Sequence, residues 1–200
     1  MSQHFVERGG LPPGLTSFTK IRLGWIKKDE VRWVRPGETA VAFLSPLSVG
    51  GGTVAVKIPL SSGKYYLVEN RQPVGFDRAL PDSGILVLKI NPDAQEGYGT
   101  VQVMDATPTT PHFRQATYRL EAAGRNLFRD PEVAVIPLWQ EGDRLGVLVS
   151  TSEKSTQAME AARAVAALTK QGGPAEPRAA KAKAAFMAFD FNKCLELAGH

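Results

Sequence analysis

Four charged residues near the middle of the chain have the types and spacing to form a site. Glu69 and Arg71 lie two positions apart in a stretch rich in β-branched and aromatic residues, and Asp77 and Asp82 follow in a polar loop. Because side chains two apart on a strand point to the same face, Glu69 and Arg71 are predicted to be neighbours.

Two interpretations of these residues are open. The carboxylates could form a calcium site or a substrate clamp. Alternatively, a buried Glu69–Arg71 pair, with Asp77 capping loop amides, fixes one corner of a β domain. The loop lacks the dense alternating Asp and Asn ligands of calcium-binding loops, which favours the structural role. An enzyme of unfamiliar type would instead use Glu69, Asp77 and Asp82 as acid and base groups in a cleft.

Other catalytic chemistry has little support in the sequence. The histidines are His4, His112 and His200, and none belongs to the His-Glu-x-x-His pattern of a zinc protease. No G-x-S-x-G elbow is present. Cys194 is the single cysteine, so neither an intramolecular disulfide nor a multi-cysteine metal site can form, and a buried structural thiol is expected.

Composition indicates an ordinary globular protein of 200 residues, with 43% hydrophobic and 22% charged residues. The net charge is +4, but the basic residues are scattered among acidic ones, so no nucleic-acid partner is expected. No apolar run is long enough for a membrane span, so no membrane partner is expected. The N-terminal sequence has no signal-peptide pattern, which predicts a cytoplasmic chain, or an extracellular one if an upstream segment is missing.

The elements that must position the charged residues are mainly β-strands. Residues 1–38 are predicted to be an irregular lead-in with one short helix around Leu15–Leu23, ended by Gly24. Residues 39–150 are predicted to be an antiparallel β domain, a sandwich or a partly open barrel, because no helical pattern separates neighbouring strands. The strands are expected at 39–44, 53–60, 64–71, 84–90, 99–106, 132–139 and 144–151.

Residues 151–200 are predicted to be a C-terminal helical hairpin, which makes the fold class α+β. Ser150 and Glu153 have the spacing of a capping box at the start of the first helix. A second helix is expected over about 176–188, followed by a short third piece with Asp190 as its N-cap.

Two segments resemble the immune inhibitor A family of zinc metalloproteases. In that family a K-x-x-L-G-W segment follows the catalytic region, and a longer Y-Y-L-x-E-x-R … G-F-D … L-P … G-L-L segment comes later. Here the first motif is matched by Lys20, Leu23, Gly24 and Trp25. The second is matched by Tyr65, Tyr66, Leu67, Glu69, Arg71, Gly75, Phe76, Asp77, Leu80, Pro81, Gly84 and Ile85. Order and spacing agree over roughly residues 1–105.

The resemblance implies a chain without its own catalytic centre. The family's zinc helix lies upstream of these motifs, and Met1 in MSQHF resembles the methionine of the Met-turn beneath the zinc. No cofactor is therefore expected in this chain, and zinc only together with an upstream catalytic region. The resemblance implies a non-catalytic C-terminal portion of such a protease, with an upstream protease core or a second copy as partner.

The alternative function is a β-sandwich module that binds a polypeptide or a glycan. Loops 72–83 and 91–98 would form its binding surface, and Trp33, Tyr65, Tyr66 and Tyr98 could supply stacking rings. Tyr65 and Tyr66 point to opposite faces of one strand, so at least one of them is expected in the core.

Overall fold

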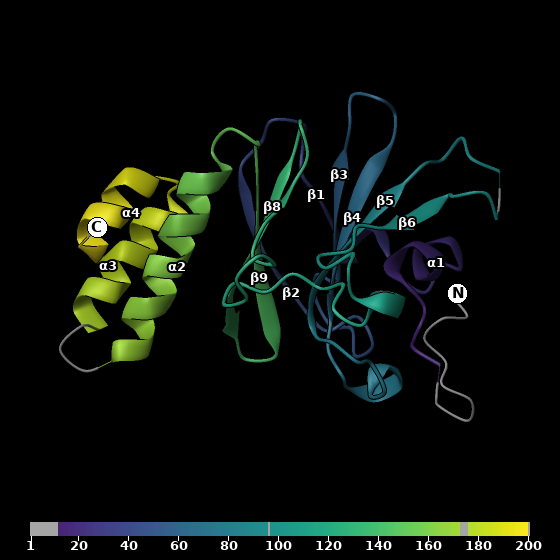
Figure 1. The fold of residues 1–200 in the computed structure, drawn as a ribbon, viewed down its shortest axis with the longest axis horizontal. Helices are drawn as coiled ribbons and strands as arrows, with labels where there is room; N and C mark the ends of the chain where they lie inside the picture. Colours follow the sequence, from purple (N-terminus) through teal and green to yellow (C-terminus); the bar gives the residue numbers. More distant parts are fainter. Residues whose placement is uncertain (1–11, 96, 173–175, 200) are drawn as a thin grey trace.

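The computed structural model describes residues 12–95, 97–172 and 176–199, and it places two β-sheets face to face with helices on both outer sides (Figure 1). Three C-terminal helices form one outer layer, and the short helix α1 (Ser17–Arg22) lies on the far side of the other sheet. No helix within the described ranges combines the length and apolar character needed to cross a membrane.

The first sheet has the strand order β1-β3-β4-β5-β6. Its strands are β1 (Val31–Trp33), β3 (Ala55–Pro59), β4 (Tyr65–Arg71), β5 (Gly84–Ile90) and β6 (Val101–Val103). Strands β3 to β6 pair antiparallel, whereas β1 pairs parallel to β3. The parallel pair arises because the intervening strand β2 crosses to the second sheet. Strand β1 lies within the predicted irregular lead-in and differs from that prediction.

The second sheet has the strand order β2-β9-β8-β7, and all its pairs are antiparallel. Its strands are β2 (Ala40–Leu44), β7 (Phe128–Arg129), β8 (Ala134–Glu141) and β9 (Arg144–Ser150). Three short 3-10 helices complete the β region: η2 (Lys28–Glu30), η3 (Gly75–Asp77) and η4 (Pro111–Phe113).

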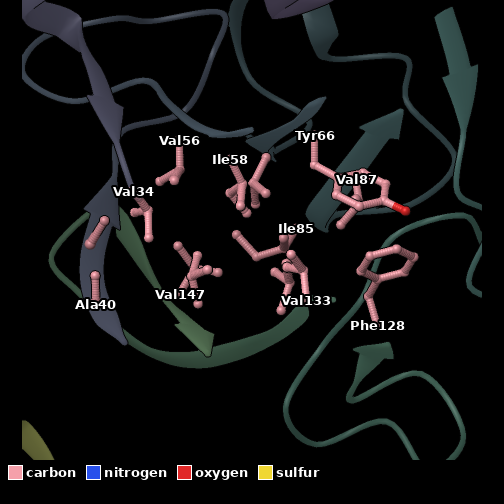
Figure 2. Close-up of a cluster of buried hydrophobic side chains, with 14 of the residues drawn as sticks. Val34, Ala40, Val56, Ile58, Tyr66, Ile85, Val87, Phe128, Val133 and Val147 are labelled. Atoms are coloured by element: carbon pink, nitrogen blue, oxygen red, sulfur yellow. The ribbon is translucent and has the colours of Figure 1, made fainter. Parts of the chain in front are cut away.

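The main core lies between the two sheets, where alternate side chains of each strand point inward (Figure 2). Val56 and Ile58 from the first sheet meet Val147 and Val149 from the second, and all four are at most 2% exposed. Burial of each such side chain contributes about 1.5–3 kcal/mol to the stability of the folded state. The predicted α+β fold with a β-sandwich and C-terminal helices is confirmed, and the sheets do not close into a barrel.

The C-terminal region contains three helices that all contact one another: α2 (Ser155–Gln171), α3 (Glu176–Met187) and α4 (Phe191–Ala198). They pack on the outer face of the second sheet, against side chains that include Ile136 and Leu148. The predicted cap of α4 is confirmed, because the Asp190 carboxylate accepts a hydrogen bond from the Lys193 amide at 3.0 Å.

The predicted start of the first C-terminal helix is wrong. Ser150 is the last residue of β9, and the N-cap of α2 is Lys154, whose side chain makes no capping bond. Ser150 pairs with Ala134 of β8, so its backbone belongs to the sheet and does not begin a helix. The chain needs the turn at 151–154 to pass from the sheet into the helix.

Candidate functional site

Glu69, Arg71 and Asp77 form a buried cluster, which we call the anchor cluster. Strand alternation places Glu69 and Arg71 on the outer face of the first sheet, opposite to the buried Tyr66 and Val68. Arg71 Nη1 donates to Glu69 Oε1 at 3.1 Å, and Nη2 donates to Asp77 Oδ1 at 2.7 Å. The side chains are 5% exposed or less. The predicted Glu69–Arg71 pair is present, and the turn η3 brings Asp77 to it.

The remaining hydrogen bonds of the anchor cluster go to the backbone of residues 14–17. The Gly14 amide donates to Asp77 Oδ1 at 2.8 Å, and the Ser17 amide donates to Glu69 Oε2 at 2.7 Å. Arg71 Nη2 donates to the Gly14 carbonyl oxygen at 3.0 Å. The cluster therefore ties the segment before α1 to the first sheet.

Glu69 also caps α1 from a distance. The N-cap residue Thr16 makes no side-chain capping bond, so the amide of Ser17 would lack a local acceptor. Glu69, 52 positions later in the chain, supplies that acceptor. A carboxylate at this end of a helix also interacts favourably with the positive end of the helix dipole.

Helix α1 has further contacts to the sandwich along its length. Phe18 and Ile21 pack against a small cluster on the outer face of the first sheet that includes Leu67 and Leu88. Lys20 Nζ donates to the Leu47 carbonyl oxygen at 2.7 Å. Burial lowers the pKa of Lys20, although the nearby Asp77 carboxylate acts in the opposite direction. Lys20 thus links α1 to the loop after β2.

Several other residues of the resemblance motifs support the fold, through burial and a hydrogen bond or through a backbone conformation that favours glycine. Tyr66 is fully buried, and its hydroxyl donates to Asp130 Oδ2 at 2.6 Å. Desolvation and this bond raise the pKa of Tyr66. Gly84 has a φ of 143°, and a Cβ there would lie 2.6 Å from the Tyr118 carbonyl oxygen, so only glycine fits. Gly24 has a φ of 72° just after α1, where the sequence predicts the helix to end.

Among the remaining motif residues, Leu67 and Ile85 are buried, whereas those that follow are exposed or lie outside the described range. Trp25 is 64% exposed and Phe76 is 82% exposed. Pro81 is exposed in the loop before β5, and Gly75 begins η3 with a φ of 56°. Met1, the expected Met-turn residue, lies outside the described residues.

Asp82 belongs to a separate network and does not join the anchor cluster. Its Oδ2 accepts hydrogen bonds from Thr117 Oγ1 at 2.7 Å and from Arg125 Nη1 at 2.8 Å. Among the described residues, no group of three or more His, Cys, Asp or Glu side chains is placed to hold a metal ion. Glu69 and Asp77 instead share one arginine in a buried position.

Sequence reasoning missed the backbone of residues 14–17 and the side chain of Lys57. Lys57 Nζ lies 4.3 Å from the ring centroid of Trp33 and 4.0 Å from that of Tyr65. Burial lowers the pKa of Lys57, and the two rings offer it cation–π stabilisation. The alternation of β3 was the available signal, because it places Lys57 on the outer face with Tyr65.

Of the four aromatic residues proposed for binding, only Trp33 and Tyr65 lie together, on either side of Lys57. Tyr66 is buried, as expected for one of the tyrosine pair. Trp33 and Tyr98 are exposed, but Trp33 lies on the edge strand β1 and Tyr98 follows β5 near the opposite edge of the first sheet.

An exposed apolar patch, formed by Val49, Val74 and Phe76, lies beside the anchor cluster. Its two loops touch, because Ser48 Oγ donates to the Val74 carbonyl oxygen at 2.8 Å. Phe76 lies next to Gly14, because a Cβ added to Gly14 would lie 3.7 Å from the Cβ of Phe76. The patch therefore borders the segment that the anchor cluster holds.

Two hollows lie away from these residues. One, of about 480 Å³, lies between α1 and the loop before β6 and is lined by Phe18, Arg22 and Thr100. The other, of about 970 Å³, lies between α2 and α4. Neither is lined by Glu69, Asp77 or Asp82.

Comparison of the chain with protein-family models, curated proteins and solved structures finds no match.

Proposed function

We propose that this chain is the non-catalytic portion, from the Met-turn onward, of an immune-inhibitor-A-like metalloprotease. In this proposal the β-sandwich has a structural or accessory role beside a protease core, and the chain alone has no peptidase activity. The observation that carries the proposal is the anchor cluster. Three polar residues of the resemblance motif use their hydrogen-bonding groups to hold the chain's own residues 14–17.

The surroundings of the anchor cluster support the same role. A polar site for substrate or metal needs groups that can reach a ligand, whereas Glu69, Arg71 and Asp77 are buried and bonded to one another. The apolar patch of Val49, Val74 and Phe76 borders the anchored segment. Exposed apolar surface of this kind is typical of a contact with another protein unit. We propose that the protease core contacts this patch.

The test is an assay of the purified 200-residue protein for zinc and for proteolysis. After equilibration with zinc and removal of the excess, elemental analysis should find well under one equivalent of zinc per chain. Casein should stay intact under conditions in which an active zinc protease, used as a positive control, degrades it. Casein cleavage together with stoichiometric zinc would overturn the proposal.

A module that binds a polypeptide or a glycan is the weaker candidate. The exposed Trp33, with Lys57 beside it, supports this candidate. Trp33 and Tyr98 lie near opposite edges of the first sheet, however, so they do not line one shared groove. Titration of the protein with soluble polysaccharides and peptides, followed by tryptophan fluorescence, tests it. A saturable signal that Trp33→Ala removes would favour the binding module.

A further inference from the structure

The side chain of Lys57 lies between two aromatic rings on the outer face of the first sheet. Its Nζ is 4.3 Å from the ring centroid of Trp33 and 4.0 Å from that of Tyr65. The sheet sets this arrangement, because Trp33 and Lys57 are register partners on the neighbouring strands β1 and β3. Tyr65 pairs with Pro59, two residues further along β3, and so lies diagonally across from the lysine on β4. We call Trp33, Lys57 and Tyr65 the Lys57 site.

The Lys57 site is open to solvent. Strand β1 is an edge strand of the first sheet, and Trp33 is 61% exposed. Lys57 and Tyr65 are half-buried. A small planar molecule could therefore rest on the indole ring of Trp33 with one of its groups close to the amine.

The amine of Lys57 has no polar partner within the described ranges, where Nζ makes neither a hydrogen bond nor an ion pair. Burial beside the rings lowers the pKa of Lys57. A larger fraction of its side chain is then the neutral amine, which is the form that reacts as a nucleophile. Burial raises the pKa of Tyr65 and the nearby Arg22 acts against this rise, so a second cation borders the site. A like charge nearby also disfavours an ammonium group.

Two other lysines share one feature of the Lys57 site but not both. Burial also lowers the pKa of Lys20, but the Asp77 carboxylate favours its charged form and its Nζ donates to the Leu47 carbonyl oxygen at 2.7 Å. Lys89 contacts one ring, that of the buried Tyr66, at 5.5 Å. Lys57 instead combines a desolvated amine with an open aromatic surface.

We infer that Lys57 is a nucleophilic site that binds planar aromatic aldehydes as a Schiff base. The neutral amine attacks the carbonyl carbon, so that a C–N bond forms while the π electrons of the carbonyl move to its oxygen. One proton moves from the nitrogen to this oxygen, which gives a carbinolamine. The hydroxyl then leaves as water with the second proton of the nitrogen, and a C=N double bond remains.

Trp33 supplies the preference for a planar aldehyde. An aromatic ring stacked on the indole gains a favourable contact and holds its carbonyl group close to Nζ. Such positioning raises the effective concentration of the aldehyde at the amine. Neither the anchor cluster nor the proposed relationship to a protease enters this chemistry, so the inference goes beyond the proposed function.

Labelling of the full 200-residue chain with pyridoxal, a planar aromatic aldehyde, tests the inference. Borohydride reduces each Schiff base to a stable secondary amine, and peptide mass spectrometry then measures the label at each lysine. At about pH 7.5 only about one in a thousand ordinary lysine amines is neutral, so Lys57 should carry at least about fivefold more label than any other lysine. Acetaldehyde, which has no ring to stack on Trp33, should show a smaller preference for Lys57. Equal label at Lys57 and at the other lysines would overturn the inference.

A variant of the exposed ring gives an independent test. Trp33→Ala should leave the fold intact, as judged by circular dichroism, and should reduce the pyridoxal label at Lys57 to the level of the other lysines. Trp25→Ala, at another exposed tryptophan, is the matched control and should leave the label unchanged. Cation–π attraction favours the ammonium form, so more label at Lys57 in Trp33→Ala than in the wild type would show that the ring protects the amine, and would overturn the inference. Unchanged label in Trp33→Ala, or an equal preference with acetaldehyde, would overturn it as well.

Discussion

The outer faces of the two sheets are covered in different ways. The first sheet carries the six-residue helix α1, held by a few apolar contacts and by the buried anchor cluster. The second sheet carries α2, α3 and α4, whose contacts to it are mainly apolar. Ordering a segment costs about 1–2 kcal/mol per residue, and a short helix buries little apolar area to offset this cost. A short covering element therefore needs directed polar contacts, whereas a long one can rely on burial.

The largest effect is expected on the helical side, from Phe186→Ala. Phe186 is fully buried and packs on both Trp139 and Phe191. Its loss should lower the free energy of unfolding by about 4 kcal/mol, measured by urea denaturation. Phe189→Ala, at a residue that is 40% exposed, should cost much less. Equal losses at the two positions would contradict a core centred on Phe186.

On the α1 side, Asp77→Asn should destabilise the protein by about 2–3 kcal/mol, because Arg71 then lacks one of its two carboxylate partners in a buried position. Hydrogen exchange should also accelerate at the amides of residues 14–17 before the rest of the chain unfolds. Asp93→Asn, at an exposed position, is the control. A fully stable Asp77→Asn protein would show that the anchor cluster does not hold α1.

A third prediction concerns the thiol beneath the helices. Cys194 is fully buried, and this burial raises its pKa to about 11. At about pH 8.5 an exposed thiol is partly ionised, so the folded protein should react with a disulfide reagent roughly a hundredfold more slowly than the unfolded protein. Spectrophotometry with and without denaturant measures this ratio. Comparable rates would mean that the helices do not seal this core.

The smallest effect is expected at the ion pair between Lys183 and Glu141. Lys183 Nζ donates to Glu141 Oε1 at 2.6 Å, and this bond lowers the pKa of Glu141. Because the folded pKa is the lower one, the stabilisation is present above the ordinary glutamate pKa and is lost as the pH falls through the folded value. Both side chains are more than a third exposed, so Lys183→Met should cost under about 1 kcal/mol at pH 7.

The pH dependence supplies the check on this pair. The difference in unfolding free energy between wild type and Lys183→Met should shrink towards zero as the pH falls through the lowered pKa of Glu141 and this carboxylate becomes protonated. A difference that stays constant between about pH 3 and pH 7 would assign the effect to the packing of Lys183 on the Trp139 ring.

Most strands could be predicted from the sequence because their apolar residues alternate. The two missed strands, β1 and β7, have three and two residues. Segments this short cannot show an alternation of apolar and polar residues. The start of α2 was misplaced because Ser150 and Glu153 match a capping pattern locally, while the pairing of Ser150 with Ala134 is a long-range contact. A local sequence pattern cannot show that a long-range strand pairing competes with a helix cap for the same residue.

For the candidate site, the shared face of Glu69 and Arg71 follows from the sequence, because strand geometry sets it. The sequence also contains no His-Glu-x-x-His motif. What the anchor cluster holds depends on the tertiary structure. Its partners at Gly14 and Ser17 are backbone groups 63 and 52 positions away, and backbone amides are the same in every residue type except proline. Their engagement depends on the path of the chain across the sheet, which no local pattern encodes.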